Sequence, residues 1–308
     1  MLIYDNRKYS ICVDEEFIAR VEKKLNVQCL FGGAHSTMVY EIATPMSDLD
    51  FYLIFDRGNT DLKEYVFSDC ETNFDVNMIE INHINFSNKQ YYKTICKYPS
   101  IFMRDSQASI PFSNKHRADY TSQLIFEILY SDYIWDSGYL KKNIDTLLSQ
   151  LSFLGVLDYY YSRVYGHLTN NLSNNFVGAR NILMAFLGYS CMKWLLLYQT
   201  IPVMKFQVMY ELFCPNQFRT FLFYAYQKQI GASFDCDNVV NVDVLHGKGT
   251  FSKKVKVMLE RNDNFNSWLA DELRVIADEM GRLHERNQDN KINIGHAAFC
   301  ATYLGAIK

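Results

Sequence analysis

The chain has 308 residues, of which 49% are hydrophobic and 21% charged, and its formal net charge is −3. This length is enough for two domains of ordinary size, and the apolar content is enough for a large buried core. The negative net charge argues against a positive electrostatic potential over the whole molecule that would attract nucleic acid. The composition excludes an intrinsically disordered chain.

The cysteines and the apolar runs indicate the cellular compartment in which the protein is expected. The eight cysteines are scattered and show no CxxC or Cys/His cluster with zinc spacing. The N-terminus lacks the apolar core of a signal peptide. The longest apolar stretch, 182–198, is short for a membrane span and is interrupted by Lys193. We therefore expect a cytoplasmic protein with no membrane partner.

The first third of the chain shows the hydrophobic spacing of a small mixed α/β domain. The elements expected there are a helix over 15–25, strands over 27–31, 49–55 and 74–81, and a short helix over 36–42. Between the first strand and the short helix stands a glycine pair, Gly32-Gly33, which we expect to form a turn.

After about residue 91 the hydrophobic period becomes helical. The helices expected there lie over 121–135, 139–157, 175–198 and 268–285. Residues 246–250 read as a loop, and 255–258 as either helix or strand. The fold class is therefore α+β, with a small mixed-sheet domain over 1–110 followed by a larger, mainly helical domain over 111–308.

Three aspartates carry the chemistry of the small domain. Asp48 and Asp50 open the second predicted strand, where alternate residues share one face. Two neighbouring carboxylates repel each other unless a divalent cation lies between them. Asp75 adds a third carboxylate on the next predicted strand. Free backbone N–H groups at a Gly32-Gly33 turn would suit a phosphate, so the set favours phosphoryl or nucleotidyl transfer.

These motifs resemble those of the nucleotidyltransferase superfamily typified by DNA polymerase beta. The matching segments are Phe31-Gly32-Gly33, Asp48-Leu49-Asp50 and Phe74-Asp75-Val76. The run from Tyr40 to Asp50 is similar to the motif of bacterial predicted nucleotidyltransferases, and a sheet domain followed by helices equally fits aminoglycoside nucleotidyltransferases. Two features depart from the pattern: Gly33 stands where serine is commoner, and the spacer to Asp48 is longer than usual.

The resemblance implies a role for each motif residue. Asp48, Asp50 and Asp75 would be catalytic and would hold two Mg²⁺ ions, or Mn²⁺ in their place. Gly32 and Gly33 would cradle the phosphates of ATP or another nucleoside triphosphate, and the nucleotide-binding domain would be the one over 1–110.

Four further residues are candidates for nucleotide binding. Ser36 would supply the hydroxyl that Gly33 lacks, and Ser47 directly precedes the aspartates. Arg180 and Lys193 lie on an otherwise apolar predicted helix, from which a basic side chain can reach triphosphate oxygens. The alternatives are that these two pair with a carboxylate or extend to solvent.

The function implied is Mg-dependent transfer of a nucleoside monophosphate from a triphosphate to a hydroxyl of a small molecule or a protein. The helical domain over 111–308 would bind that acceptor. Two alternatives stay open. One is transfer to an RNA or tRNA 3′ end, which the net charge disfavours. The other is a non-catalytic, antitoxin-like regulatory module, against which the three aspartates argue.

Overall fold

In the computed structural model the chain divides into two compact units, each assembled from separate segments. The first contains residues 1–84, 124–144 and 226–257, and the second contains residues 85–123, 145–225 and 258–308. The residues that the structure describes are 2–5, 10–13, 15–34, 37–44, 49–58, 64–69, 74–81, 127–129, 134–149, 153–231, 239–245 and 251–285. Segments that follow residue 111 thus belong to the same unit as the N-terminal strands.

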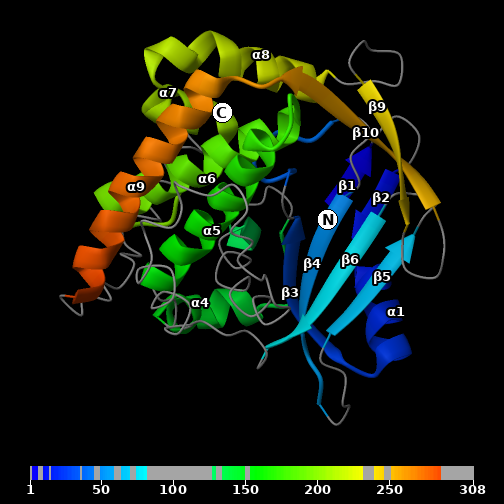
Figure 1. Ribbon diagram of the computed structural model, residues 1–308. Coiled ribbons are helices and arrows are strands. Elements are labelled where there is room, and N and C mark those ends of the chain that lie inside the picture. The colour runs from blue at the N-terminus through cyan, green and yellow to red at the C-terminus, as the bar shows by residue number, and fades with distance from the viewer. Residues whose placement is uncertain are drawn as a thin grey trace. The chain divides into compact units, whose positions relative to one another are not determined.

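The first unit is built on a five-stranded sheet with the strand order β5-β6-β4-β3-β7 (Figure 1). The strands are β3 (Gln28–Ala34), β4 (Leu49–Asp56), β5 (Glu64–Asp69), β6 (Phe74–Glu80) and β7 (Ile134–Asp136). β4 and β6 run parallel, whereas the other neighbouring pairs run antiparallel. The sheet is therefore mixed, and the α+β class is confirmed by the helices described below.

One face of this sheet packs against α1 (Glu15–Leu25), which forms as expected. Ile18 and Val21 of the helix are buried against alternate residues of the central strand, namely Phe51, Leu53 and Phe55. Alternation along a strand sends every second side chain to the same face, so one apolar set covers the helix side. Asn26, with φ of 54°, ends the helix in the left-handed conformation.

Two further antiparallel pairs contribute strands to the first unit. β1 (Leu2–Asp5) pairs with β2 (Ser10–Val13), and β9 (Val239–Leu245) pairs with residues 251–257 of β10 (Phe251–Glu260). The last three residues of β10 belong to the second unit, where they pair with β8 (Phe176–Gly178). The stretch 255–258 is therefore strand. The loop predicted over 246–250 connects β9 to β10 and lies outside the described residues.

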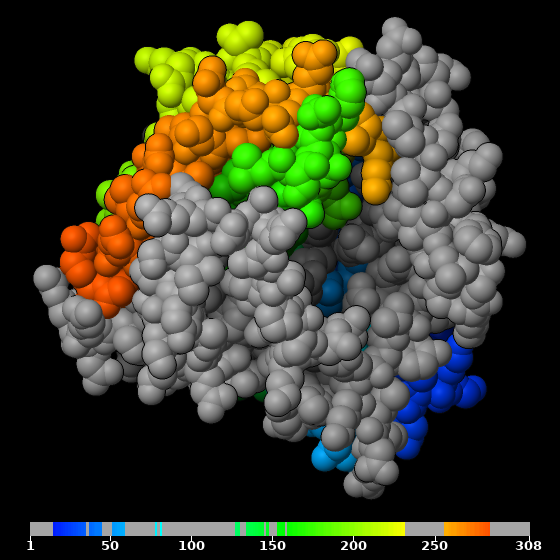
Figure 2. Space-filling model, viewed as in Figure 1, coloured from blue at the N-terminus to red at the C-terminus, as the bar shows by residue number. Residues whose placement is uncertain are grey.

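The second unit is mainly helical. Its elements are α5 (Phe153–Leu172), β8 (Phe176–Gly178), α6 (Ala179–Tyr198), α7 (Phe206–Phe213), the 3₁₀ turn η4 (Asn216–Phe218) and α9 (Asp263–Glu285). Two helices are divided between the units: α4 (Tyr139–Ser149) leads into the second unit after residue 144, and α8 (Arg219–Ile230) leaves it after residue 225. Figure 2 shows α9 in orange beside the green α5, against which it packs.

Four helices of the sequence-based expectation were wrong in extent. The helix over 175–198 begins only at Ala179, because 176–178 form the strand β8, and the helix over 268–285 begins earlier, at Asp263. The single helix over 139–157 is two helices, because α4 ends at Ser149 and α5 begins at Phe153. Of the helix over 121–135, the described part is helical only at 127–129 and ends in β7.

α6 is the central helix of the second unit. Among the described residues it is the one helix whose length and hydropathy match a membrane span, and 72% of its most apolar window is buried. Gly188 lets α5 approach closely, because a Cβ there would lie 2.6 Å from Val164 Cγ2. A helix that is apolar all round is normally buried in the core of a protein, and α6 has this position in the second unit.

Candidate nucleotide and metal site

Two of the three predicted metal-binding aspartates occupy directly opposite positions in the sheet. β4 and β6 run parallel, and their register pairs Asp50 with Asp75. Each is the second residue of its strand, so both lie at the edge of the sheet where these strands begin. Register partners on neighbouring strands share one face, and the strands are about 4.8 Å apart. The backbone therefore brings together two carboxylate-bearing positions from distant segments.

The C-terminal end of β3 reaches the same edge. β3 runs antiparallel to β4, and its register pairs Gly33 with Tyr52 and Ala34 with Phe51. Tyr52 follows Asp50 by two residues, so Gly33 and Asp50 belong to the face opposite the one that packs on α1. Gly33 thus lies in the row of the sheet next to the aspartates, as a shared site requires.

The two glycines differ from the expectation in conformation. The strand predicted to end at Phe31 continues to Ala34, so Gly32 and Gly33 lie inside β3 and pair with both β4 and β7. Successive residues of a strand direct their N–H groups to opposite edges, whereas an anion cradle needs neighbouring N–H groups on one side. The predicted turn is wrong for this pair, and their part in nucleotide binding stays a prediction.

Gly32 has a clear reason to lack a side chain. A Cβ at this position would lie 2.4 Å from the Tyr52 main-chain oxygen and 2.8 Å from Phe51 Cε1. Both atoms belong to the neighbouring strand, and a main-chain oxygen in a sheet has no room to move. Glycine at this position is therefore a packing requirement of the central strands.

The segment after β3 forms a hydrogen-bonded turn, so the helix expected over 36–42 is wrong for the described residues 37–42. The Ile42 N–H donates to the Thr37 carbonyl oxygen at 3.0 Å, and the Glu41 N–H donates to the Met38 carbonyl oxygen at 3.2 Å. Glu41 has a φ of 57°. These two bonds around a left-handed residue are the Schellman ending of a helix. The predicted residue Ser36, just before the turn, lies outside the described residues.

A buried carboxyl group that the sequence reading missed lies beside this turn. Glu127 is fully buried, and its Oε1 accepts a hydrogen bond from the Tyr40 hydroxyl at 3.2 Å. On the same segment the Ile42 carbonyl oxygen accepts a bond from Gln229 Nε2 at 3.3 Å. The only available signal was a single acidic residue inside the apolar run 124–129, which does not separate a functional group from a structural one.

Of the two basic candidates, Lys193 has a carboxylate partner. Its Nζ lies 3.5 Å from Glu272 Oε2, and the Tyr189 hydroxyl donates to the same oxygen at 3.0 Å. Burial, together with the neighbouring Glu272, raises the pKa of Tyr189 well above its ordinary value. The carboxylate alternative for Lys193 is thus confirmed, and the contact joins α6 to α9.

Arg180, the other basic candidate, is the second residue of α6 and is exposed. It acts on His167 of α5, whose pKa it helps to lower. Arg180 and Lys193 belong to the helical unit, whereas the glycines and the aspartates belong to the sheet unit.

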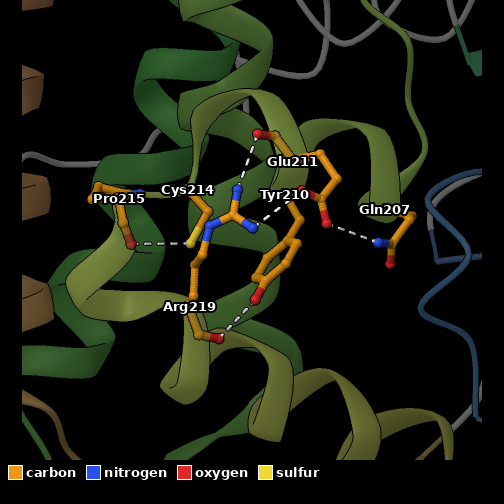
Figure 3. Close-up of polar contacts among 6 residues, drawn as sticks. All are labelled: Gln207, Tyr210, Glu211, Cys214, Pro215 and Arg219. Carbon is orange, nitrogen blue, oxygen red and sulfur yellow. Dashed lines mark hydrogen bonds and ion pairs between the residues drawn. The ribbon is translucent and has the colours of Figure 1, made fainter.

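A polar cluster around Arg219 joins α7 to the start of α8 (Figure 3). Its guanidinium donates to the Glu211 carboxylate at 3.1 Å and lies 5.1 Å from the centre of the Tyr210 ring. The Tyr210 hydroxyl donates to the Arg219 carbonyl oxygen at 3.1 Å. Burial raises the pKa of Cys214 to about 11, so its thiol stays protonated at neutral pH. All these contacts are local, and they fix the turn between the helices.

The remaining predicted residues are less defined. Asp48 and Ser47 lie outside the described residues, and Asp50 and Asp75 are described in backbone only. Among the side chains that the structure does describe, no group of three or more His, Cys, Asp or Glu is placed to hold a metal ion. The site therefore rests on strand register rather than on side-chain geometry.

Comparison with known proteins found no family model and no curated protein that matches this chain.

Proposed function

We propose that this chain is a Mg-dependent nucleotidyltransferase, which transfers a nucleoside monophosphate from a nucleoside triphosphate to a hydroxyl group. ATP is the preferred donor, and the acceptor is a small molecule or a protein. The observation that carries the proposal is the register of Asp50 with Asp75 at one edge of the sheet. Asp48 stands two residues before Asp50 in the sequence.

The proposed chemistry follows from the negative charge of these neighbouring aspartates. Carboxylates placed side by side repel each other, and a hard divalent cation is the partner that makes such a placement favourable. The ion would orient the triphosphate and lower the pKa of the acceptor hydroxyl. Asp50 would hold the nucleotide side of the site, and Asp75 the acceptor side.

The proposal also assigns the two units their parts. The first unit would be the nucleotidyltransferase domain, because its segment 1–84 contains all three aspartates and Gly33. The helical unit would bind the acceptor. Support for this division comes from the resemblance of the motifs and from the mixed character of the sheet.

The direct test is calorimetry of ATP binding with Mg²⁺ and with EDTA, followed by a transfer assay with α-labelled triphosphates. We expect Mg²⁺ to strengthen binding and Asp50→Asn to remove that gain. Asp56→Asn is the matched control, because Asp56 ends the same strand and accepts a bond from the Gly58 N–H at 2.9 Å. Equal ATP affinity with and without the ion would contradict the proposal.

The two alternative functions give different results in the same assay. A transferase acting on RNA would label added RNA or tRNA 3′ ends in preference to protein or small hydroxyl compounds. A non-catalytic module would bind a triphosphate, or nothing, and transfer no label to any acceptor. Asp75→Asn separates these cases, because it should abolish transfer by an enzyme and leave a purely binding module unchanged.

A further inference from the structure

The turn over 37–44, between β3 and β4, is held by side chains from two remote parts of the first unit. The Tyr40 hydroxyl donates to Glu127 Oε1 at 3.2 Å, and Gln229 Nε2 donates to the Ile42 carbonyl oxygen at 3.3 Å. Glu127 lies 87 residues beyond Tyr40 in the chain, and Gln229 lies 187 residues beyond Ile42. Both bonds are buried, so the fold anchors this turn from its inner side.

The buried polar side chains of the first unit gather around this turn. Tyrosines and cysteines aside, four such residues are found in the part of the unit that the structure describes: Thr37, Thr44, Glu127 and Gln229. Two of them belong to the turn, and the other two bond to it. Apolar side chains of similar size would hold a turn at no greater cost in free energy. Hydrogen-bonded polar groups instead fix a single arrangement.

The turn is connected at both ends to the sheet edge that carries Asp50. The last pair between β3 and β4 is Ala34 with Phe51, and Asp50 is the next residue of β4 towards that edge. Thr37 follows Ala34 by three residues, so at most about 11 Å of extended chain separates them. Thr44 precedes Asp50 by six residues, which span at most about 22 Å. Short lengths of chain therefore tie both strand ends to the anchored turn.

We propose that Glu127 and Gln229 are positioning residues for nucleotidyl transfer, because they hold the turn that sets where β3 ends and β4 begins. The inference rests on the proposed function, in which Asp50 and Asp75 hold a divalent cation. Mg²⁺ requires near-ideal octahedral geometry, with ligand oxygens at about 2.0–2.1 Å. A carboxylate displaced by about 1 Å at this edge would lower the transfer rate by about a hundredfold.

The test removes the anchoring hydrogen bonds one at a time in the full-length protein. Tyr40→Phe removes the donor to Glu127 and keeps the ring, Glu127→Leu removes the acceptor, and Gln229→Met removes the donor to the turn. Glu127→Gln is the conservative variant, because its amide oxygen can still accept the Tyr40 bond. The control is Ile18→Ala, which removes a buried side chain of the same unit from the sheet face that packs on α1.

The readouts are kcat for transfer of labelled ATP, its dependence on Mg²⁺ concentration, and the melting temperature. We expect Tyr40→Phe, Glu127→Leu and Gln229→Met each to lower kcat by about ten- to a hundredfold. Each should also raise the Mg²⁺ concentration needed for half the maximal rate, with KM for ATP little changed at saturating Mg²⁺. Glu127→Gln should restore most of the rate that Glu127→Leu loses.

The control separates positioning from plain stabilisation. Ile18→Ala should lower the melting temperature and leave kcat and the Mg²⁺ dependence unchanged below it. Equal losses of kcat in Ile18→Ala and in Glu127→Leu would overturn the positioning role. So would anchor variants that keep the wild-type kcat and Mg²⁺ dependence while the wild type transfers label. A wild-type protein whose ATP binding gains nothing from Mg²⁺ would overturn the proposed function, and this inference with it.

Discussion

The two units of this protein use their charged residues in opposite ways. In the helical unit, charges of opposite sign meet: Lys193 with Glu272 between two helices, and Arg219 with Glu211 beside one turn. In the sheet unit, strand register sets Asp50 beside Asp75, a pairing of like charges. Such a pair is destabilising by itself. Under the proposed function a divalent cation would relieve this repulsion, whereas the helical pairs are already balanced in charge.

The largest effect is expected when one negative charge is removed from the pair Asp50 and Asp75. Asp50→Asn and Asp75→Asn should each lower the transfer rate at least about a hundredfold, because metal-ion stabilisation of the transition state amounts to several kcal/mol. The same changes should keep or raise the melting temperature of metal-free protein, since they relieve repulsion. A labelled-ATP assay and a melting scan on each variant measure both effects. Asp56→Asn should change neither, and loss of stability with unchanged transfer would make the aspartates structural.

Packing inside the sheet gives the next largest effect. Gly32→Val should lower the free energy of unfolding by about 3 kcal/mol, because its Cβ would overlap the Tyr52 main-chain oxygen. Gly281→Ala is the control: nothing lies within 4 Å of a Cβ there, and alanine should stabilise α9 by about 0.5–1 kcal/mol. Urea unfolding of both variants checks the two signs. A stable Gly32→Val protein would mean that β3 and β4 are further apart than the structure has them.

The half-buried His167 makes the stability of the helical unit depend on pH. The folded-state pKa of His167 is lowered to about 3, below the ordinary value of about 6.5. Its contribution is therefore fully present above pH 6.5 and is lost as the pH falls towards 3, because the unfolded chain takes up the proton first. Between pH 6.5 and 5 the loss should be about 2 kcal/mol. Urea unfolding across this range should show a shallower slope for His167→Gln; an identical slope would mean that the imidazole is protonated in the folded protein.

The smallest effect concerns the charge pair between α6 and α9. Lys193 and Glu272 have side chains 32% and 28% exposed, so solvent weakens their attraction. Lys193→Met and Glu272→Gln should each lower the free energy of unfolding by about 0.5–1 kcal/mol, and the double variant by less than the sum. ATP affinity should stay within about twofold of wild type, since Lys193 already has a partner. A large loss of ATP binding in Lys193→Met, with little loss of stability, would return this lysine to the nucleotide site.

Much of the architecture could be predicted from local patterns. The helix over 15–25 and the strands beginning at Leu49 and Phe74 were correct, because apolar residues at helical or alternating spacing specify which face is buried. The strands β1, β2, β5, β7, β8 and β9 were not identified. They are short or follow polar stretches, and a strand is stabilised by its neighbours more than by its own sequence.

The candidate site was likewise predictable in part: its residue types could be read from the sequence, but its contacts could not. Composition and spacing singled out Gly33, Asp50 and Asp75, yet gave no distance between them. The roles of Gly32 and Lys193 depended on contacts with Tyr52 and Glu272, which are remote in sequence or lie across a strand pair. Glu127 was overlooked for the same reason, because its partner Tyr40 is on a different segment.

The sequence by itself determined the α+β class and the central apolar helix, and it supplied the candidate residues of the proposed site. These depend on side-chain chemistry and on periodicity, both of which are local properties. Only the tertiary structure decided that Asp50 lies opposite Asp75, that the glycine pair lies inside a strand, and that Lys193 meets Glu272. Strand register and helix packing join residues far apart in the chain, and they follow from the burial of whole faces rather than from any single segment.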